Sequence, residues 1–271
     1  MTESAGTRRR PLEAAPDWVI PVQAFDDNYI WLVDNGDGSA FVVDPGDPSP
    51  VNAALSDRGL RLDAILITHH HFDHVGGLVA LKEQHGCRVV GPANPAIAGI
   101  DTALRHGDSV RVGSCEFSVL EVPGHTLDHI AYFCRDATPP LLFCGDTLFA
   151  GGCGRLFEGT PAVMHDSLGR LAALPAETLV YCAHEYTLAN LAFARAAEPD
   201  NEALAARQRA AAELREAGVP TVPSTIGQEQ TTNPFLRSSE VSVQRTLKAA
   251  GRDAADPVSA FASLRSWKDH F

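Results

Sequence analysis

Thr68-His69-His70-His71-Phe72-Asp73-His74 is the stretch of sequence that decides the fold. It places histidine and aspartate at His-x-His-x-Asp-His spacing, directly after the run Leu62-Asp63-Ala64-Ile65-Leu66-Ile67. That short apolar run predicts a buried strand, so the cluster lies at the strand's C-terminal end. Inward-facing imidazoles need polar partners, and a metal ion satisfies several of them at once. Because zinc, iron and manganese all accept imidazole and carboxylate ligands, the stretch predicts a metal site.

The length and charge of the chain narrow the class of protein. With 271 residues, the chain exceeds a typical single domain and predicts two domains, or one large domain with an appendage. The formal net charge of −12 argues against non-specific nucleic-acid binding, which needs lysine and arginine to neutralise phosphates. We therefore expect no nucleic-acid partner.

The cysteines and the N-terminus indicate the compartment. There are 6 cysteines, no Cys-x-x-Cys pair, and most of them lie in apolar runs, which predicts buried reduced thiols in a cytoplasmic protein. No run approaches the roughly eighteen apolar residues of a membrane span. The start carries Arg8-Arg9-Arg10 and then Pro11-Leu12-Glu13, which is not a secretory signal. We expect a disordered tail over 1–16 and no membrane partner.

Short strand-like runs alternate with helical runs up to about residue 182. The composition predicts a hairpin turn at Asn35-Gly36-Asp37-Gly38 and a second one at Gly113-Ser114. Helices are expected after Asp47-Pro48 and over 75–85 and 161–174. The expected strands are 19–22, 29–33, 40–43, 62–68, 88–90, 109–112, 116–120, 130–134, 141–144 and 179–182.

After His184 the sequence becomes rich in alanine, glutamate, arginine and leucine with helical spacing. Asp200 is expected to cap a helix through 214, and Asp256-Pro257 predicts another helix start. We therefore divide the chain into domains of 17–184 and 185–271, the second helical with one long loop over 219–233.

Three later segments supply further candidate ligands next to predicted strands. Each alone is a weak signal, since a lone histidine is more often structural than a ligand. Together with the first cluster they could complete two adjacent metal sites, because their shared position at strand ends would let them converge. They are Pro123-Gly124-His125-Thr126-Leu127-Asp128-His129, Phe143-Cys144-Gly145-Asp146-Thr147-Leu148-Phe149 and Tyr181-Cys182-Ala183-His184-Glu185-Tyr186.

These motifs together resemble the metallo-β-lactamase superfamily, and further stretches narrow the resemblance to glyoxalase II, the hydroxyacylglutathione hydrolases. The resemblance implies a metallo-β-lactamase αββα sandwich followed by a small all-helical C-terminal domain that binds substrate. The further stretches are Asp27-Asn28-Tyr29, Val43-Asp44-Pro45-Gly46, Gly152-Cys153-Gly154-Arg155-Leu156-Phe157-Glu158-Gly159-Thr160, His184-Glu185-Tyr186-Thr187, Thr232-Asn233-Pro234-Phe235-Leu236-Arg237 and the terminal Arg265-x-x-Lys268-Asp269.

The resemblance also implies the ligands of two divalent metal ions, with zinc expected first and iron or manganese as alternatives. One metal is assigned to His69, His71 and His129, and the other to Asp73, His74 and His184. Asp146 is expected to bridge both metals. His70 and His125 are expected to lie outside the ligand set, since they fall between ligands in the motif.

The implied reaction is hydrolysis of S-D-lactoylglutathione and related 2-hydroxyacylglutathiones, in methylglyoxal detoxification. Two metals can lower the pKa of a bridging water to roughly 7, which provides hydroxide as the nucleophile. Asp73 and Asp146 are expected to be catalytic, and Asp73 to orient the nucleophile. The expected substrate contacts are Arg155 and Tyr186 for the peptide backbone, Arg265 and Lys268 for the glycine carboxylate, and Phe157, where some family members have tyrosine.

Other functions compete with this interpretation. One is a persulfide dioxygenase or another thioester hydrolase of the same superfamily, disfavoured by the helical C-terminal region and the terminal Arg/Lys pair. Another is a non-catalytic metal-binding or thiol-sensing scaffold, for which we expect a missing ligand, whereas every position is filled. We expect an acylglutathione as the small-molecule partner, and a monomer.

Overall fold

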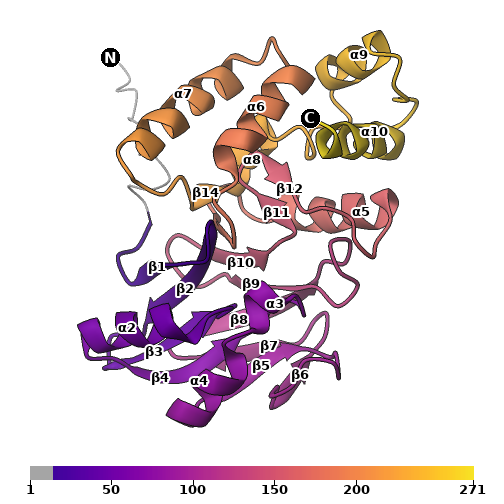
Figure 1. Ribbon diagram of the computed structural model, residues 1–271. Helices are drawn as coiled ribbons and strands as arrows, with labels where there is room; N and C mark the ends of the chain where they lie inside the picture. The colour runs from indigo at the N-terminus through magenta and orange to yellow at the C-terminus, as the bar shows by residue number, and fades with distance from the viewer. Residues whose placement is uncertain (1–14) are drawn as a thin grey trace, which may run out of the picture.

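The computed structural model describes residues 15–271. Most of the expected N-terminal tail, 1–14, lies outside the described residues. The described residues form two six-stranded sheets, one two-stranded hairpin and a set of helices (Figure 1).

The first sheet has the strand order β1-β2-β3-β4-β5-β6. Its first three strands pair antiparallel, and the pairs from β3 to β6 are parallel. The predicted hairpin turn at 35–38 joins β2 to β3, and this prediction is confirmed. The strands are β1 (Val19–Ala24), β2 (Asn28–Asp34), β3 (Ser39–Val43), β4 (Arg61–Leu66), β5 (Arg88–Pro92) and β6 (Thr102–Leu104).

Both faces of this sheet are covered, because its strands are apolar on both sides. Along β2, Trp31 and Val33 point to the large core that the first sheet shares with the second, whereas Ile30 and Leu32 point to a smaller core. This alternation is what the two-residue period of a strand requires. The smaller core is closed by the helices α2 (Pro48–Arg58) and α4 (Leu78–His85).

The second sheet has the order β14-β13-β10-β9-β8-β7, in which only β10 and β13 are parallel. The large core runs through it to the helices α5 (Pro161–Ala172) and α10 (Pro257–Asp269). The expected αββα sandwich is therefore confirmed. The strands are β7 (Ser109–Val112), β8 (Cys115–Glu121), β9 (Ile130–Cys134), β10 (Leu141–Gly145), β13 (Leu179–Cys182) and β14 (Ser224–Thr225), and the separate hairpin comprises β11 (Leu148–Phe149) and β12 (Gly152–Cys153).

The C-terminal region is helical, as expected, and lies at the end of the molecule opposite α2 and α4 (Figure 1). Its helices are α6 (Thr187–Ala197), α7 (Glu202–Glu216), α8 (Ile226–Thr232), α9 (Val241–Ala249) and α10. The expected long loop over 219–233 is wrong, because it contains β14 and α8. The helix cap is also one residue later than expected: the Asn201 side chain, not that of Asp200, accepts from the amide of Leu204.

One expected helix is divided. The run over 75–85 becomes a short α3 (Phe72–Val75) and a separate α4. Gly76 and Gly77 lie between them, and a Cβ atom on either would come within 2.6 Å of the backbone oxygen of Gly46 or Pro45. Only glycine allows this close approach. The two glycines therefore let the histidine-rich stretch pack directly against the turn after β3.

The prediction of buried thiols is confirmed. All 6 cysteines are free and buried. Among the helices of residues 15–271, none combines the length and hydropathy that crossing a membrane requires.

Candidate metal centre

Four segments bring the candidate ligands to one place. Residues 68–74 follow β4, residues 122–129 join β8 to β9, Asp146 follows β10 and His184 follows β13. The carboxyl ends of the parallel neighbours β10 and β13 meet at the same sheet edge. The topology thus converts ligands spread along the chain into one cluster.

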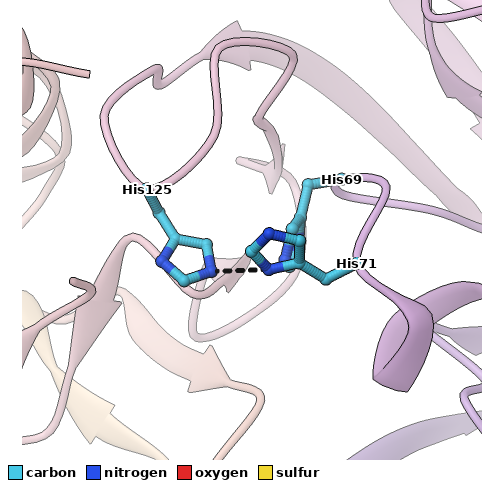
Figure 2. Close-up of side chains that lie close together, drawn as sticks. All are labelled: His69, His71 and His125. Atoms are coloured by element: carbon cyan, nitrogen blue, oxygen red, sulfur yellow. Dashed lines mark hydrogen bonds between the residues drawn. The ribbon is translucent and has the colours of Figure 1, made fainter. Parts of the chain in front are cut away.

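The first group of possible ligands is His69, His71 and His125. Figure 2 shows His125 approaching from one side and the other two from the opposite side. Nδ1 of His71 lies 3.0 Å from Nε2 of His125. Burial lowers the pKa of all these imidazoles, so they are neutral at pH 7 and can offer lone pairs to a metal.

The second group is Asp73, His74 and His184. Oδ2 of Asp73 lies 3.5 Å from Nε2 of His74 and 3.4 Å from Nε2 of His184. Burial opposes charge on both histidines, but the facing carboxylates, above all that of Asp146, outweigh it: the pKa of His74 rises well above its usual value and that of His184 rises to about 10. The carboxylates therefore stabilise positive charge at this point.

Asp146 lies between the two groups. Its Oδ1 is 3.5 Å from Nε2 of His74. Its Oδ2 is 3.3 Å from Nε2 of His184 and 3.4 Å from Nε2 of His125. One carboxylate thus faces ligands of both groups, the arrangement expected for a bridge.

Unpaired atoms show that this cluster fits metal ions. Nε2 of His69, Nε2 of His74 and Oδ1 of Asp146 are buried and have no hydrogen-bond partner. Buried polar atoms are rarely left unpaired, because each one costs free energy. Tetrahedral zinc, with ligands at about 2.0–2.2 Å, separates its ligand atoms by about 3.3–3.6 Å, which the spacings around Asp146 match.

Other side chains fix the orientation of these ligands. Oδ2 of Asp44 lies 3.0 Å from Nδ1 of His74, while the same carboxylate accepts from the backbone amide and the hydroxyl of Thr68. Oδ1 of Asp27 lies 2.8 Å from Nδ1 of His184. Asn28 donates to Oδ2 of Asp73 over 3.0 Å. Such partners set the tautomer and direction of a metal-binding imidazole.

Asp27, Asn28 and Asp44 have no role in the sequence-based expectations, although they belong to stretches that carry the resemblance. One feature could have identified Asp44 as part of the site, namely its position at the end of a strand. Asp44 directly follows β3, the neighbour of β4, so strand ends alone would place it beside His69.

The structure groups His125, rather than the expected His129, with His69 and His71. Nε2 of His129 accepts from the backbone amide of Asp146 over 3.1 Å, and its Nδ1 lies 3.1 Å from the carbonyl of Ile130. Burial lowers its pKa to about 3, so the ring is neutral. His129 therefore contacts the backbone of Asp146, and His125, which was expected outside the ligand set, lies beside His71.

His70, which was expected outside the ligand set, lies outside the cluster. Its Nδ1 is 2.9 Å from Oδ1 of Asp128, and its Nε2 is 3.5 Å from Oε1 of Glu158. The two carboxylates already accept hydrogen bonds, from Asn94 and Thr126 and from the amide of Leu127. This group joins the loops around the centre and has little free capacity for a metal.

A cavity of about 610 Å³ opens above the cluster. Its floor includes His71, Asp73, His125, Asp146 and His184. All the expected substrate-contacting residues line it: Arg155, Phe157, Tyr186, Arg265 and Lys268. Phe157 is exposed, and its ring centre lies 5.3 Å from that of His125.

The terminal Arg/Lys pair is not a solvated helix face. The guanidinium of Arg265 is buried, donates to the carbonyl of Cys153 over 3.0 Å and to Asp269 over 2.9 Å, and lies over the ring of Phe235. Lys268 is half-buried and, among residues 15–271, forms no ion pair. Burial, together with the nearby Arg265 and Arg155, lowers its pKa. Lys268 is thus the freer of the two cations.

The αββα sandwich and a histidine–aspartate cluster at its strand ends define a metallo-β-lactamase-type protein. Residues 24–184 match the metallo-beta-lactamase superfamily, and residues 185–271 match the hydroxyacylglutathione hydrolase C-terminus. A hydroxyacylglutathione hydrolase of Pseudomonas aeruginosa (strain LESB58) is 57% identical over 251 residues, covering 92% of this chain and 97% of that protein. The chain belongs to the hydroxyacylglutathione hydrolase family.

Solved structures share the fold. ETHE1 from Myxococcus xanthus has a TM-score of 0.62 and 29% identity, covering 91% of this chain and 90% of that one. TTHA1623, solved in a di-iron-bound form, has a TM-score of 0.58 and 29% identity, covering 80% of this chain and 100% of that one.

Proposed function

We propose that this protein hydrolyses the thioester of 2-hydroxyacylglutathiones, S-D-lactoylglutathione among them, to glutathione and the hydroxy acid. The observation that carries the proposal is the position of Asp146, whose carboxylate faces both ligand groups at the floor of a cavity walled by cations. Family membership supports the same reaction, because relatives 48–57% identical are named hydroxyacylglutathione hydrolase.

The residues of the cluster would hold two divalent ions. His69, His71 and His125 would bind one, and Asp73, His74 and His184 the other, with Asp146 between them. Such a pair supplies a hydroxide at neutral pH and stabilises negative charge on a carbonyl oxygen. The donor set accepts zinc, iron or manganese, and zinc is our first expectation. The di-iron form of TTHA1623 shows that this fold also accommodates iron.

The protein's own residues prepare the site for thioester cleavage. Asp27, Asp44 and Asn28 hold His184, His74 and Asp73 in fixed directions, so little reorganisation is needed during the reaction. A thiolate is a good leaving group, because the pKa of a thiol, about 8.5 for free cysteine, lies near the operating pH. No separate general acid is therefore required.

The cavity suits an anionic tripeptide. Arg155 and Lys268 present positive charge to it, and Tyr186 and Phe157 provide flat apolar surface beside the metal cluster. We place the glycine carboxylate at Lys268, the freer cation, and the thioester between Phe157 and Tyr186. Arg265 also lines the cavity, and it would contribute positive charge while its guanidinium stays bonded to Cys153 and Asp269. Phe157 has no hydroxyl, so it can offer packing but no hydrogen bond.

The test combines metal analysis with turnover. The purified protein should contain about two metal ions per chain and hydrolyse S-D-lactoylglutathione without oxygen, at a KM well below that for a small thioester lacking glutathione. Fewer than two ions in the active protein, or equal KM values for both substrates, would defeat the proposal.

The alternative of persulfide dioxygenase makes the opposite prediction. An oxygenase needs oxygen, so anaerobic thioester hydrolysis separates the two reactions. The match of residues 185–271 to the hydroxyacylglutathione hydrolase C-terminus favours hydrolysis.

A further inference from the structure

Side chains of the helical region bond the backbone of the hairpin β11–β12. It follows Asp146 in the chain, is buried, and turns at Gly151, whose φ is +70°. The structure pairs Leu148 with Cys153 and Phe149 with Gly152. Backbone groups at such a tight buried tip need outside partners, because few of them can pair with each other.

A fully buried carboxylate provides the first partner. Glu229 on α8 accepts from the amide of Gly151 over 2.8 Å. It also accepts from the guanidinium of Arg207 over 2.5 Å and from the side-chain amide of Asn233 over 3.0 Å. A buried ion pair contributes little net stability compared with apolar packing, so stability alone does not account for this pair.

The carbonyl groups of the hairpin have partners as well. Asn233 donates to the carbonyl of Gly152 over 2.8 Å and to that of Phe149 over 3.2 Å. Asn190 on α6 donates to Ala150, and Arg265 on α10 donates to Cys153. Every hairpin residue from 149 to 153 is thus bound by a side chain from residues 190–265.

The hairpin in turn touches the metal cluster. A Cβ atom on the next residue, Gly154, would lie 2.0 Å from the backbone oxygen of Asp146 and 3.1 Å from Nδ1 of His125. The ring of Phe149 packs edge-on against His184, with centres 5.8 Å apart. Any displacement of the hairpin is therefore transmitted directly to three residues of the cluster.

We infer that Glu229, Arg207 and Asn233 are positioning residues that hold Asp146 in register with the two ligand groups. None of the three lines the cavity. They should therefore govern metal affinity and kcat, whereas KM should depend on the cavity wall. The inference rests on the proposed dinuclear site and assigns the helical region a second role besides substrate binding.

The variants are Asn233→Leu, which removes the donor to two hairpin carbonyls, and Glu229→Gln, which removes the charge that Arg207 pairs with. For each we expect chelator competition to show at least about tenfold weaker binding of the second metal, as for other residues that support metal ligands. kcat should fall by a similar factor, and KM should stay within about twofold. The visible spectrum of the Co²⁺-loaded variants should differ from that of the parent.

Glu198→Gln is the matched control. Glu198 is also a buried carboxylate of the helical region, paired with Arg237 over 2.7 Å and 2.8 Å and bonded to Asn201, but it touches neither the hairpin nor the cavity. It should lose stability without a change in metal affinity, Co²⁺ spectrum or kcat.

Two results would overturn the inference: unchanged metal affinity in both folded variants, or an equal loss in the control. A parent protein that holds fewer than two metals would instead refute the proposed function. The two failures are therefore distinguishable. If Glu229→Gln does not fold, Asn233→Leu decides the question alone.

Discussion

At the scale of single residues, the site depends on which ring nitrogen of each histidine is occupied. His74 and His184 have their Nδ1 atoms held by aspartates, so Nε2 faces the cluster. In His129 both nitrogens are taken by the backbone. We expect a histidine of this last kind to support the site and not to bind a metal, however close it lies to the ligand cluster.

This distinction leads to a prediction for two neighbouring histidines. His125→Ala should reduce the metal content from about two ions per chain to about one and lower kcat by more than about 100-fold, beyond the range for residues that only support ligands. His129→Gln, which keeps an acceptor, should retain two ions. Elemental analysis of the purified variants measures this directly, and loss of metal from His129→Gln alone would reverse the assignment.

Sequence spacing alone could not choose between these histidines. The stretch 123–129 contains both, and either can reach a strand end. The choice is made by a contact distant in sequence, the amide of Asp146 against His129, which no local pattern encodes. By contrast, 69–74 could be predicted, since its ligands share one short turn.

Lys268 provides a prediction of pH dependence. Burial and the neighbouring Arg265 and Arg155 lower its pKa, so its charge is present at neutral pH and is lost, as pH rises, earlier than that of an exposed lysine. KM for lactoylglutathione should therefore rise in the alkaline range below about pH 10.4, by up to about fivefold for one partly exposed ion pair. In Lys268→Arg the rise should disappear, because arginine stays protonated. Steady-state kinetics corrected for spontaneous hydrolysis test this; a parallel rise in both proteins would exclude Lys268 as the source.

At the scale of elements, the close approach of Gly154 to Asp146 restricts where the end of the hairpin can lie. Gly154→Ala places a carbon 2.0 Å from the Asp146 backbone oxygen, so the segment must shift. We expect metal affinity and activity to fall together, by at least about tenfold. Gly169→Ala in α5, where nothing lies within 4 Å, should instead stabilise the fold by about 0.5–1 kcal/mol. Chelator competition and thermal unfolding of both variants distinguish local displacement from a general glycine effect.

Elements with a clear period could be predicted from the sequence, and short ones could not. β2 and β9 can be predicted from their nearly continuous apolar and aromatic residues. β11, β12 and β14 contain only 2 residues each, too few to show any alternation. They form because long-range partners such as Asn233 and β13 are available.

At the scale of the whole molecule, the helical region shares its core with the sandwich. Phe235 and Phe261 belong to the same buried cluster as Trp31 and Phe143. The division at 184/185 remains our proposal for the domain boundary, but the shared core predicts that both parts unfold together.

Phe261→Ala tests this coupling. Its ring is fully buried on α10, so the change should cost about 3–5 kcal/mol and lower the temperature of a single transition. Val241→Ala, at a side chain that is 77% exposed, should change stability by no more than about 0.5 kcal/mol. Calorimetry in which only a second, separate transition moves would show independent domains.

The double engagement of Arg265 limits how this active site can evolve. Its guanidinium spans Cys153 and Asp269 at once, a geometry that the single ammonium of lysine cannot reproduce. A lineage that acquires a new acyl-thiol substrate is therefore expected to keep this arginine and to vary Lys268, Arg155 and Phe157, whose side chains reach the cavity without supporting the hairpin. Substrate selectivity can therefore change through these three residues while Arg265 stays the same.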